Sequence, residues 1–373
     1  MPDHPADHRW MALALSLGRR GMGRTWPNPA VGCVIVKAGR IVGRGWTAPG
    51  GRPHAEPQAL AQAGAAAKGA TAYVTLEPCA HHGQTPPCAE ALVEAGIAEV
   101  VSALEDPDPR VAGKGHDILR AAGISVRCGI LADQARRDHA GFLLAKTRAR
   151  PLVTLKLASS FDGRIATSQG ESQWITGAEA RRFAHYLRAT HDAVMIGAGT
   201  ARADDPTLNV RGLGMVSQPV RLVLDSRLST DPASALGRSA TATPVWICHS
   251  AAAPAAAIAA WQKTGATLIV CAPDASGRLK LPEVLRALAA RGLTRLFCEG
   301  GGVLAAALLA EGLVDELVHL TAGLALGADG TPAVAALPPA ALADYPRFTL
   351  VESRVIGADH LQIWRRDPSA LSG

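Results

Sequence analysis

The sequence predicts an α/β protein with two domains, and three observations support this. The chain has 373 residues, which is long for a single hydrophobic core, so two cores are expected. Strand-like and helix-like segments alternate in both halves. A basic segment, "LLAKTRARPLV", interrupts the alternation and ends at Pro151. We therefore expect one domain over residues 1–147 and a second over residues 151–373.

The first half is predicted to contain a hairpin and then alternating helices and strands. A helix is expected near residues 10–18, and the run 31–46 holds two apolar segments around a Lys-Ala-Gly-Arg turn, as in a hairpin. The remaining elements are a helix at 54–63, a strand at 71–76, a helix at 88–95, a strand at 99–104, and a further helix and strand that include 118–126. This order is typical of an α/β domain.

The second half restarts with a strand and repeats the alternation. Strands are predicted at residues 152–158, 193–196, 220–225, 244–249, 267–272 and 295–300, with helical stretches between them. The alanine-rich stretch 250–261 is interpreted as a loop that leads into a helix. We find no internal repeat.

Composition indicates a cytoplasmic protein. Hydrophobic residues make up 48% of the chain, but Pro, Gly or charged residues break the longest apolar runs well before membrane-spanning length. The opening "MPDHPADHRWM" has neither the basic nor the apolar region of a secretory signal. Seven cysteines form an odd, sparse set that suits a reducing compartment.

Charge favours a small anionic substrate over nucleic acid. The formal net charge is +6, and the pI is about 9.1. Lys and Arg are scattered, however, and no run of five or more occurs. We expect no nucleic-acid or membrane partner.

One group of residues has the pattern of a catalytic zinc site. His54 and Glu56 are one residue apart at a predicted helix start, and "LEPCAHHGQTPPC" follows with Cys79 and Cys88. One imidazole and two thiolates make three ligands, which leaves the fourth tetrahedral position of zinc open for water. Glu56 can take the proton of that water and pass it to a leaving nitrogen.

This arrangement is that of zinc-dependent base deaminases, whose signature is H-x-E followed by P-C-x-x-C. One departure is that eight residues, rather than two, separate the cysteines. The alternatives are a buried histidine beside a surface glutamate, two unrelated cysteines, or a structural zinc.

With "WPNPAVGCVIV" upstream, the chain resembles the bifunctional deaminase/reductase family of bacterial riboflavin biosynthesis over nearly its full length. The resemblance implies a cytidine-deaminase-like first domain that acts on 2,5-diamino-6-(5-phosphoribosylamino)pyrimidin-4(3H)-one. It also implies His54, Cys79 and Cys88 as Zn²⁺ ligands, Glu56 as proton donor and Asn28 as a substrate contact. An ordinary Asn-Pro turn is the alternative for Asn28. Family members often carry Arg or Lys where this chain has Gln84, and a basic residue there is expected to contact the substrate phosphate.

Two glycine-rich stretches in the second half do not predict a Rossmann domain. "GAGTAR" at 197–202 lacks the third small residue, and "EGGGVLA" at 299–305 lies near the end of its domain without an acidic residue about 20 positions later. Gly300 to Gly302 nevertheless lie between a strand and a helix, so their amides can hold phosphate. A bare turn is the alternative.

The same family resemblance covers the second half through five ordered stretches: "LKLASSFDGRIAT", "GESQWITG", "GAGTARADDPTLNVR", "PVRLVLDS" and "EGGG". It implies a dihydrofolate-reductase-like domain that uses NADPH to reduce the ribosyl group of 5-amino-6-(5-phosphoribosylamino)uracil to ribityl. Family members form dimers or tetramers through this domain, so a homo-oligomer is implied.

The site residues of this domain are also implied by the resemblance. NADPH would contact Ala158, Trp174, Thr200, Asp204, Ser226, Gly301, Gly302, Val303, Leu304, Ala305, Ala306 and Ala307. The phosphorylated substrate would contact Ser172, Arg188, Leu208, Arg211 and Glu299. Lys156 would hydrogen-bond the sugar or help protonate its ring oxygen. Taken singly, Arg188 and Arg211 also fit surface charges, Trp174 a core residue, and Lys156 an exposed strand position.

Two rival functions remain open from the residues alone. A nucleoside or RNA-base deaminase with a C-terminal recruiting domain would explain the basic pI and would consume no nicotinamide. A zinc-stabilised nucleic-acid-binding protein would need a fourth zinc ligand and a basic stripe.

Overall fold

The computed structural model describes residues 5–82, 86–214 and 217–366, and these form two compact units, residues 1–149 and 150–373. Gln84 lies outside the described residues. Within the described ranges, each helix is either too short or too polar to span a bilayer.

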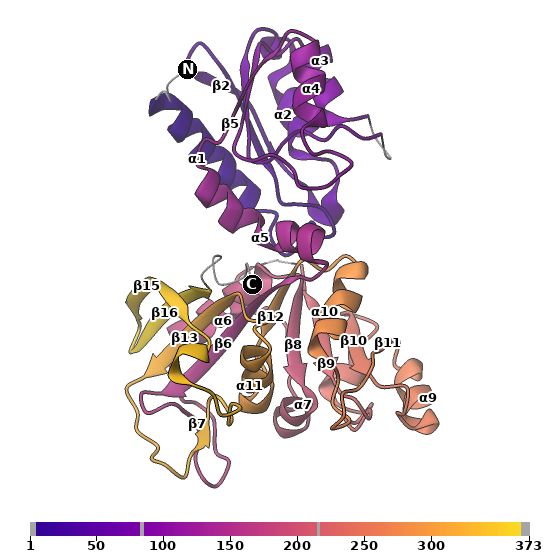
Figure 1. Ribbon diagram of the computed structural model, residues 1–373, viewed down its shortest axis with the longest axis vertical. Helices are drawn as coiled ribbons and strands as arrows, with labels where there is room; N and C mark the ends of the chain where they lie inside the picture. The colour runs from indigo at the N-terminus through magenta and orange to yellow at the C-terminus, as the bar shows by residue number, and fades with distance from the viewer. Residues whose placement is uncertain (1–4, 83–85, 215–216, 367–373) are drawn as a thin grey trace. The chain divides into compact units, whose positions relative to one another are not determined.

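The first unit is a five-stranded sheet with helices on both faces (Figure 1). The strand order is β2-β1-β3-β4-β5: β1 pairs antiparallel with β2 and β3, and β3, β4 and β5 are parallel. The elements are α1 (Pro5–Arg19), β1 (Gly32–Lys37), β2 (Arg40–Trp46), η1 (Pro49–Gly51), α2 (Ala55–Ala63), η2 (Gly64–Ala67), β3 (Thr71–Val74), α3 (Cys88–Glu94), β4 (Glu99–Ser102), α4 (Lys114–Ala121), β5 (Ser125–Cys128) and α5 (Ala132–Arg148). The predicted hairpin and the alternation after it are both present.

Helix α2 lies unusually close to strand β2, because both carry small residues where they meet. A Cβ added to Gly43 would come within 2.1 Å of the Ala59 carbonyl oxygen, and one added to Gly45 within 2.3 Å of the Ala55 carbonyl oxygen. Only glycine fits at such distances. The glycines of β2 therefore fix where the N-terminus of α2 lies.

The second unit is built on a nine-stranded sheet of order β11-β10-β9-β8-β12-β6-β13-β16-β15 (Figure 1). The strands from β11 to β13 are parallel, and β16 and β15 extend the sheet antiparallel. The strands are β6 (Leu152–Ser160), β7 (Arg164–Ala166), β8 (Ala193–Gly197), β9 (Val220–Leu224), β10 (Val245–His249), β11 (Thr267–Val270), β12 (Arg295–Cys298), β13 (Glu316–Ala322), β14 (Thr331–Pro332), β15 (Phe348–Ile356) and β16 (Asp359–Arg366). The helices are α6 (Ala178–Ala189), α7 (Ala198–Asp204), α8 (Ala235–Arg238), α9 (Ala255–Lys263), α10 (Leu281–Ala290), α11 (Gly302–Ala310) and η3 (Leu342–Asp344).

The α/β class and the six predicted strands of the second half are confirmed. The structure adds what the sequence pattern did not predict, namely helix α5 and the strands β7, β13, β14, β15 and β16. Helix α5 buries only a narrow stripe that includes Ala135, His139 and Phe142. Most of its other residues are polar or charged, so its sequence has no clear apolar periodicity. Strand β15 is exposed at nearly every position, which hides the two-residue alternation that identifies a half-buried strand.

Candidate functional site

The three predicted zinc ligands converge in the first unit. His54 is the N-cap of α2, Cys88 is the first residue of α3, and Cys79 lies in the loop after β3. The Nδ1 atom of His54 lies 3.6 Å from Sγ of Cys79 and 3.4 Å from Sγ of Cys88. The ligand atoms all lie within 4.8 Å of one another, and among the described residues no fourth ligand joins them. One nitrogen and two sulfurs fit a zinc site with one open position.

Local structure explains why two cysteines with eight residues between them can still meet. The amide of Cys88 donates to Sγ of Cys79 at 3.3 Å, and the amide of Ala89 donates to the Cys79 carbonyl at 3.2 Å. The first amides of α3 therefore hold Cys79 directly. The hydrogen bond with the Cys88 side chain, followed by the bonds with His54 and with the Cys88 amide, lowers the pKa of the Cys79 thiol to about 4 despite burial. Hydrogen bonding favours the thiolate that a metal requires.

Glu56 is buried beside this group, with a relative exposure of 3%. It lies in the first turn of α2, whose place is fixed by the glycines of β2. Burial, and next the charge of Cys79, raise the pKa of Glu56 to about 7. The alternatives of a surface glutamate and of two unrelated cysteines are therefore excluded.

A pocket of about 250 Å³ opens onto these residues. Asn28, the predicted substrate contact, lines it, and its Nδ2 donates to the Gly51 carbonyl at 2.9 Å. Polar residues that sequence analysis did not predict also line it: Arg52, Glu77, His81, Asp106, Asp108, Arg110 and Lys146. The sequence could have predicted the residues of the loop after β4, because "EDPDPR" follows that strand and loops at the carboxyl ends of parallel strands commonly form sites.

Glu77, two residues before Cys79, binds the segment that follows β4. Its carboxylate accepts hydrogen bonds from the amides of Asp106, Gly113, Gly115 and His116 at 2.8–3.2 Å. Four amide donors satisfy a buried carboxylate without a metal ion. Glu77 therefore holds the loop after β4 in the pocket wall.

In the second unit, three predicted residues meet in a largely buried charge cluster. Arg188 on α6 donates from Nε to Oε1 of Glu299 at 2.5 Å and from Nη2 to Oε2 at 3.2 Å. Lys156 on β6 places Nζ 4.0 Å from Oε2 of Glu299. The side chains of Lys156, Arg188 and Glu299 are 20%, 15% and 10% exposed, so the surface-charge alternative fails for these two cations.

The electrostatics of the cluster follow from its burial. Desolvation lowers the pKa of Lys156, and Glu299 opposes this only in part. Burial alone would raise the pKa of Glu299, but Arg188, and then Lys156, outweigh it and hold that pKa below its ordinary value. The carboxylate is therefore ionised between two cations.

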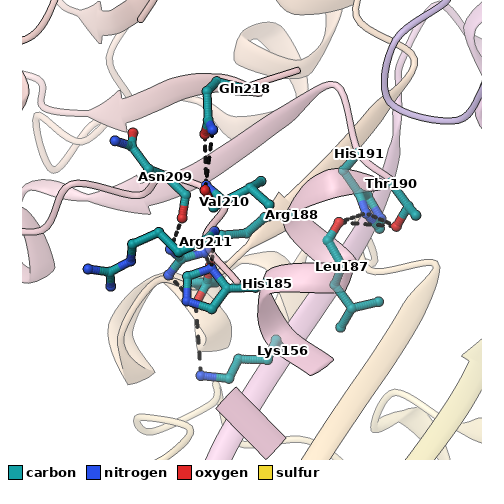
Figure 2. A network of polar contacts seen from close by, with 11 residues as sticks. Lys156, His185, Leu187, Arg188, Thr190, His191, Asn209, Val210, Arg211 and Gln218 are labelled. Carbon is teal, nitrogen blue, oxygen red and sulfur yellow. Dashed lines mark hydrogen bonds and ion pairs between the residues drawn. The ribbon is translucent and has the colours of Figure 1, made fainter. Parts of the chain in front are cut away.

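Arg211 and Leu208 lie on the loop between α7 and β9. Figure 2 shows Arg211 next to Arg188 of this cluster. The loop is tied to α6, because Nη1 of Arg188 donates to the Asn209 carbonyl at 2.9 Å. Leu208 is buried and has a φ of 53° in the left-handed region. The Arg211 side chain is exposed, so the surface-charge alternative stays open for it.

Apart from Trp174, the predicted cofactor residues lie toward the carboxyl ends of the parallel strands or in the segments that follow them. Ala158 is in β6, Ser226 follows β9, and α7, which begins after β8, carries Thr200 and Asp204. The amide of Gly301, the N-cap of α11, donates to Oγ1 of Thr200 at 3.1 Å. No side chain caps the nine-residue α11, whose first turn contains Gly302, Val303, Leu304 and Ala305, with Ala306 and Ala307 following. An uncapped helix N-terminus at this edge fits a phosphate-bearing cofactor.

Ser172 and Trp174 are not brought into the charge cluster. Among the described residues, no hydrogen bond or ion pair links either to Lys156, Arg188 or Glu299. Trp174 is 68% exposed and lies under the Arg181 guanidinium, 4.6 Å from the ring centroid. The core alternative for Trp174 is therefore wrong.

Comparisons with known proteins agree for both units. Residues 5–104 match the cytidine and deoxycytidylate deaminase zinc-binding region, and residues 151–361 match the RibD C-terminal domain. The riboflavin biosynthesis protein RibD of Escherichia coli is 42% identical over 365 residues, which cover 95% of this chain and 97% of that protein. The RibD of Haemophilus influenzae is 42% identical over 369 residues, covering 94% and 95% of the two chains.

Solved structures give the same result. A structure of Acinetobacter baumannii RibD superposes with a TM-score of 0.87 at 40% identity and covers 97% of this chain and 99% of that one. A diaminohydroxyphosphoribosylaminopyrimidine deaminase/5-amino-6-(5-phosphoribosylamino)uracil reductase from Thermotoga maritima superposes with a TM-score of 0.85 at 31% identity, over 97% and 99% of the two chains.

Proposed function

Because the chain belongs to the RibD family of riboflavin biosynthesis, we propose a division of the family's two reactions between its two units. The protein is a bifunctional enzyme, a zinc-dependent deaminase and an NADPH-dependent reductase. Its first domain is cytidine-deaminase-like, and its second is dihydrofolate-reductase-like. We assign deamination to residues 1–147 and reduction to residues 151–373.

In the first domain, His54, Cys79 and Cys88 hold the zinc. The convergence of these side chains beside buried Glu56 carries this assignment. Bound zinc supplies an activated water. Glu56 takes a proton and delivers it to the leaving amino nitrogen of 2,5-diamino-6-(5-phosphoribosylamino)pyrimidin-4(3H)-one, because it lines the pocket without being a ligand. Asn28 offers its amide to the pyrimidinone ring from the pocket wall.

In the second domain, the carboxyl edge of the parallel sheet holds NADPH, which supplies the hydride. The residues assigned to it are Ala158, Trp174, Thr200, Asp204, Ser226 and the segment Gly301 to Ala307. The uncapped N-terminus of α11 supports a phosphate contact there. The bond from Gly301 to Thr200 holds α7 against the start of α11.

The charge cluster is assigned to the ribosyl phosphate of 5-amino-6-(5-phosphoribosylamino)uracil, with Ser172 and Leu208 completing the contacts. The ionised carboxylate of Glu299 can accept bonds from ribose hydroxyls, and Lys156 can donate to the sugar. Arg188 already donates to Glu299 and to Asn209. The exposed guanidinium of Arg211 is therefore the main phosphate ligand, and the buried Arg188 supports it.

We further propose a cytoplasmic homo-oligomer, a dimer or tetramer. The seven cysteines are all free, which suits a reducing compartment. Strand β15 ends the sheet with its side chains exposed, among them Leu350, Val351 and Val355. An exposed apolar edge strand is a common site of self-association.

Zinc content tests the ligand assignment directly. We expect about one zinc per chain in the wild type and loss of that zinc in Cys79→Ser and Cys88→Ser. Cys128→Ser is the matched control, because Cys128 is exposed and belongs to no ligand group. Zinc retained in both ligand variants, with the protein folded, would contradict the assignment.

A further inference from the structure

The backbone of residues 207–211 is held in place by side chains from neighbouring elements. Arg221 on β9 donates to the Thr207 carbonyl at 3.4 Å, and Arg188 donates to the Asn209 carbonyl at 2.9 Å. Gln218 holds Val210 at two points, accepting from its amide at 2.8 Å and donating to its carbonyl at 3.2 Å. These bonds fix the path of the chain up to Arg211.

The last of these contacts comes from His185. The amide of Arg211 donates to Nδ1 of His185 at 3.2 Å. His185 lies on α6, three residues before Arg188, so both side chains lie on the same side of the helix. Figure 2 shows them together beneath the 209–211 segment, whereas Thr190 and His191 lie at the other end of the drawn helix.

We propose that His185 is a positioning residue for reduction, which fixes the Arg211 backbone so that its guanidinium meets the substrate phosphate. The proposal rests on the phosphate role assigned to Arg211 above. His185 accepts this bond at Nδ1, so the proton of the neutral ring is on Nε2. It acts through Arg211 and does not itself take part in hydride transfer.

The surroundings keep the imidazole in this acceptor state. Burial lowers the pKa of His185, and the guanidiniums of Arg188 on α6 and Arg211 on the loop lower it further. Glu299, after β12, and the Asn209 backbone oppose this without reversing it. Protonation would turn Nδ1 into a donor facing the Arg211 amide, so acid conditions should release the loop.

A double-mutant cycle in the zinc-loaded full chain tests the proposal. The variants are His185→Leu, Arg211→Ala and the double variant, assayed by NADPH oxidation with the deaminated substrate. We expect His185→Leu to raise KM for that substrate by up to about tenfold, the size of one lost hydrogen bond, and to change kcat less. Because His185 acts through Arg211, the double variant should have the KM of Arg211→Ala alone.

A conservative variant separates positioning from general damage. His185→Asn places an amide oxygen near the position of Nδ1 and should restore a near wild-type KM at neutral pH. The wild-type KM should rise as pH falls through the lowered pKa of His185. Dividing the wild-type KM by the KM of His185→Asn at each pH removes the effect of the substrate's own titration. Ammonia release from the diamino substrate is the folding control, since its site lies in the other unit.

The outcomes are distinguishable. An unchanged KM in Arg211→Ala would overturn the phosphate role of Arg211, and this inference with it. A raised KM in Arg211→Ala with an unchanged KM in His185→Leu would overturn this inference alone. Effects that multiply in the double variant would also overturn it, because His185 would then act independently of Arg211.

Discussion

Arg188 and Glu299 are 111 residues apart in the sequence and form a largely buried two-point ion pair, with N–O distances of 2.5 and 3.2 Å. Nζ of Lys156 lies 4.0 Å from Oε2 of the same Glu299 carboxylate. Glu299 therefore holds two cations in the site where the sugar phosphate is assigned. Removing it would take the bonded carboxylate from Arg188 and leave Lys156 with only the more distant charge of Asp204.

Glu299→Gln should abolish NADPH oxidation with the deaminated substrate while ammonia release from the diamino substrate continues. It should also destabilise the second domain by about 3–5 kcal/mol, the cost of breaking a buried ion pair. Glu316→Gln is the control: its Arg365 partner is 36% exposed, and such pairs contribute about 0–1 kcal/mol. Denaturant unfolding measures both variants, and equal losses would contradict the burial argument.

Glu56→Gln should keep zinc and lose deamination. The amide preserves shape but carries no transferable proton, so kcat should fall by about 10²–10⁴-fold. Metal analysis and ammonia release are measured together, with Glu94→Gln on the exposed side of α3 as control. If zinc were lost with activity, Glu56 would have to be reconsidered as a ligand.

Chelation should separate the two activities. All three predicted zinc ligands belong to the first unit, and every residue assigned to reduction belongs to the second. Chelator-treated enzyme should stop releasing ammonia yet still oxidise NADPH when given the deaminated substrate. Loss of NADPH oxidation in chelated protein that is still folded would show that the sites are not independent.

Gly302→Ala should weaken NADPH binding and destabilise the second domain by about 1–3 kcal/mol. A Cβ there would lie 2.6 Å from the Pro332 carbonyl oxygen, so the start of α11 would have to shift. Gly199→Ala is the control for stability, because its Cβ would meet no atom within 4 Å. Thermal unfolding and the KM for NADPH test this, and an unshifted melting temperature for Gly302→Ala would refute the predicted clash.

Acid should destabilise the second domain through His191. This imidazole is buried, bonds to the Leu187 carbonyl at 2.7 Å and to Oγ1 of Thr154 at 2.9 Å, and has its pKa lowered by burial from 6.5 to about 3. Between these values the unfolded chain binds a proton that the folded chain does not, so stability falls as pH falls, by about 1.4 kcal/mol per pH unit.

The substitution His191→Asn removes this titration. Hydrogen exchange of the β6 and β8 amides, measured from pH 7 down to pH 5, reports the stability of the second domain alone. The variant should show a flatter pH dependence than the wild type, whatever its absolute stability. Parallel slopes would mean that another group causes the acid sensitivity.

The sequence by itself determined the fold class and predicted which residues would bind zinc. Alternating apolar runs identify strands and helices because their periods are local properties of the chain. The ligands could likewise be predicted, because the zinc-deaminase signature is a local pattern and is present here as His54-x-Glu56 and Pro78-Cys79. The enlarged loop before Cys88 did not prevent the ligands from meeting, because the amides at the start of α3 hold Cys79.

Only the tertiary structure decided which distant residues share a site. The pairing of Arg188 with Glu299, the four amides bound by Glu77, and the bond from the Arg211 amide to His185 all join segments that no local pattern relates. Strand order and register create these contacts, because they bring together the carboxyl ends of β3 and β4 in the first unit and those of β6, β8 and β12 in the second. Strand β15 was missed for a related reason: its neighbour β16, and not its own pattern of buried residues, makes it a strand.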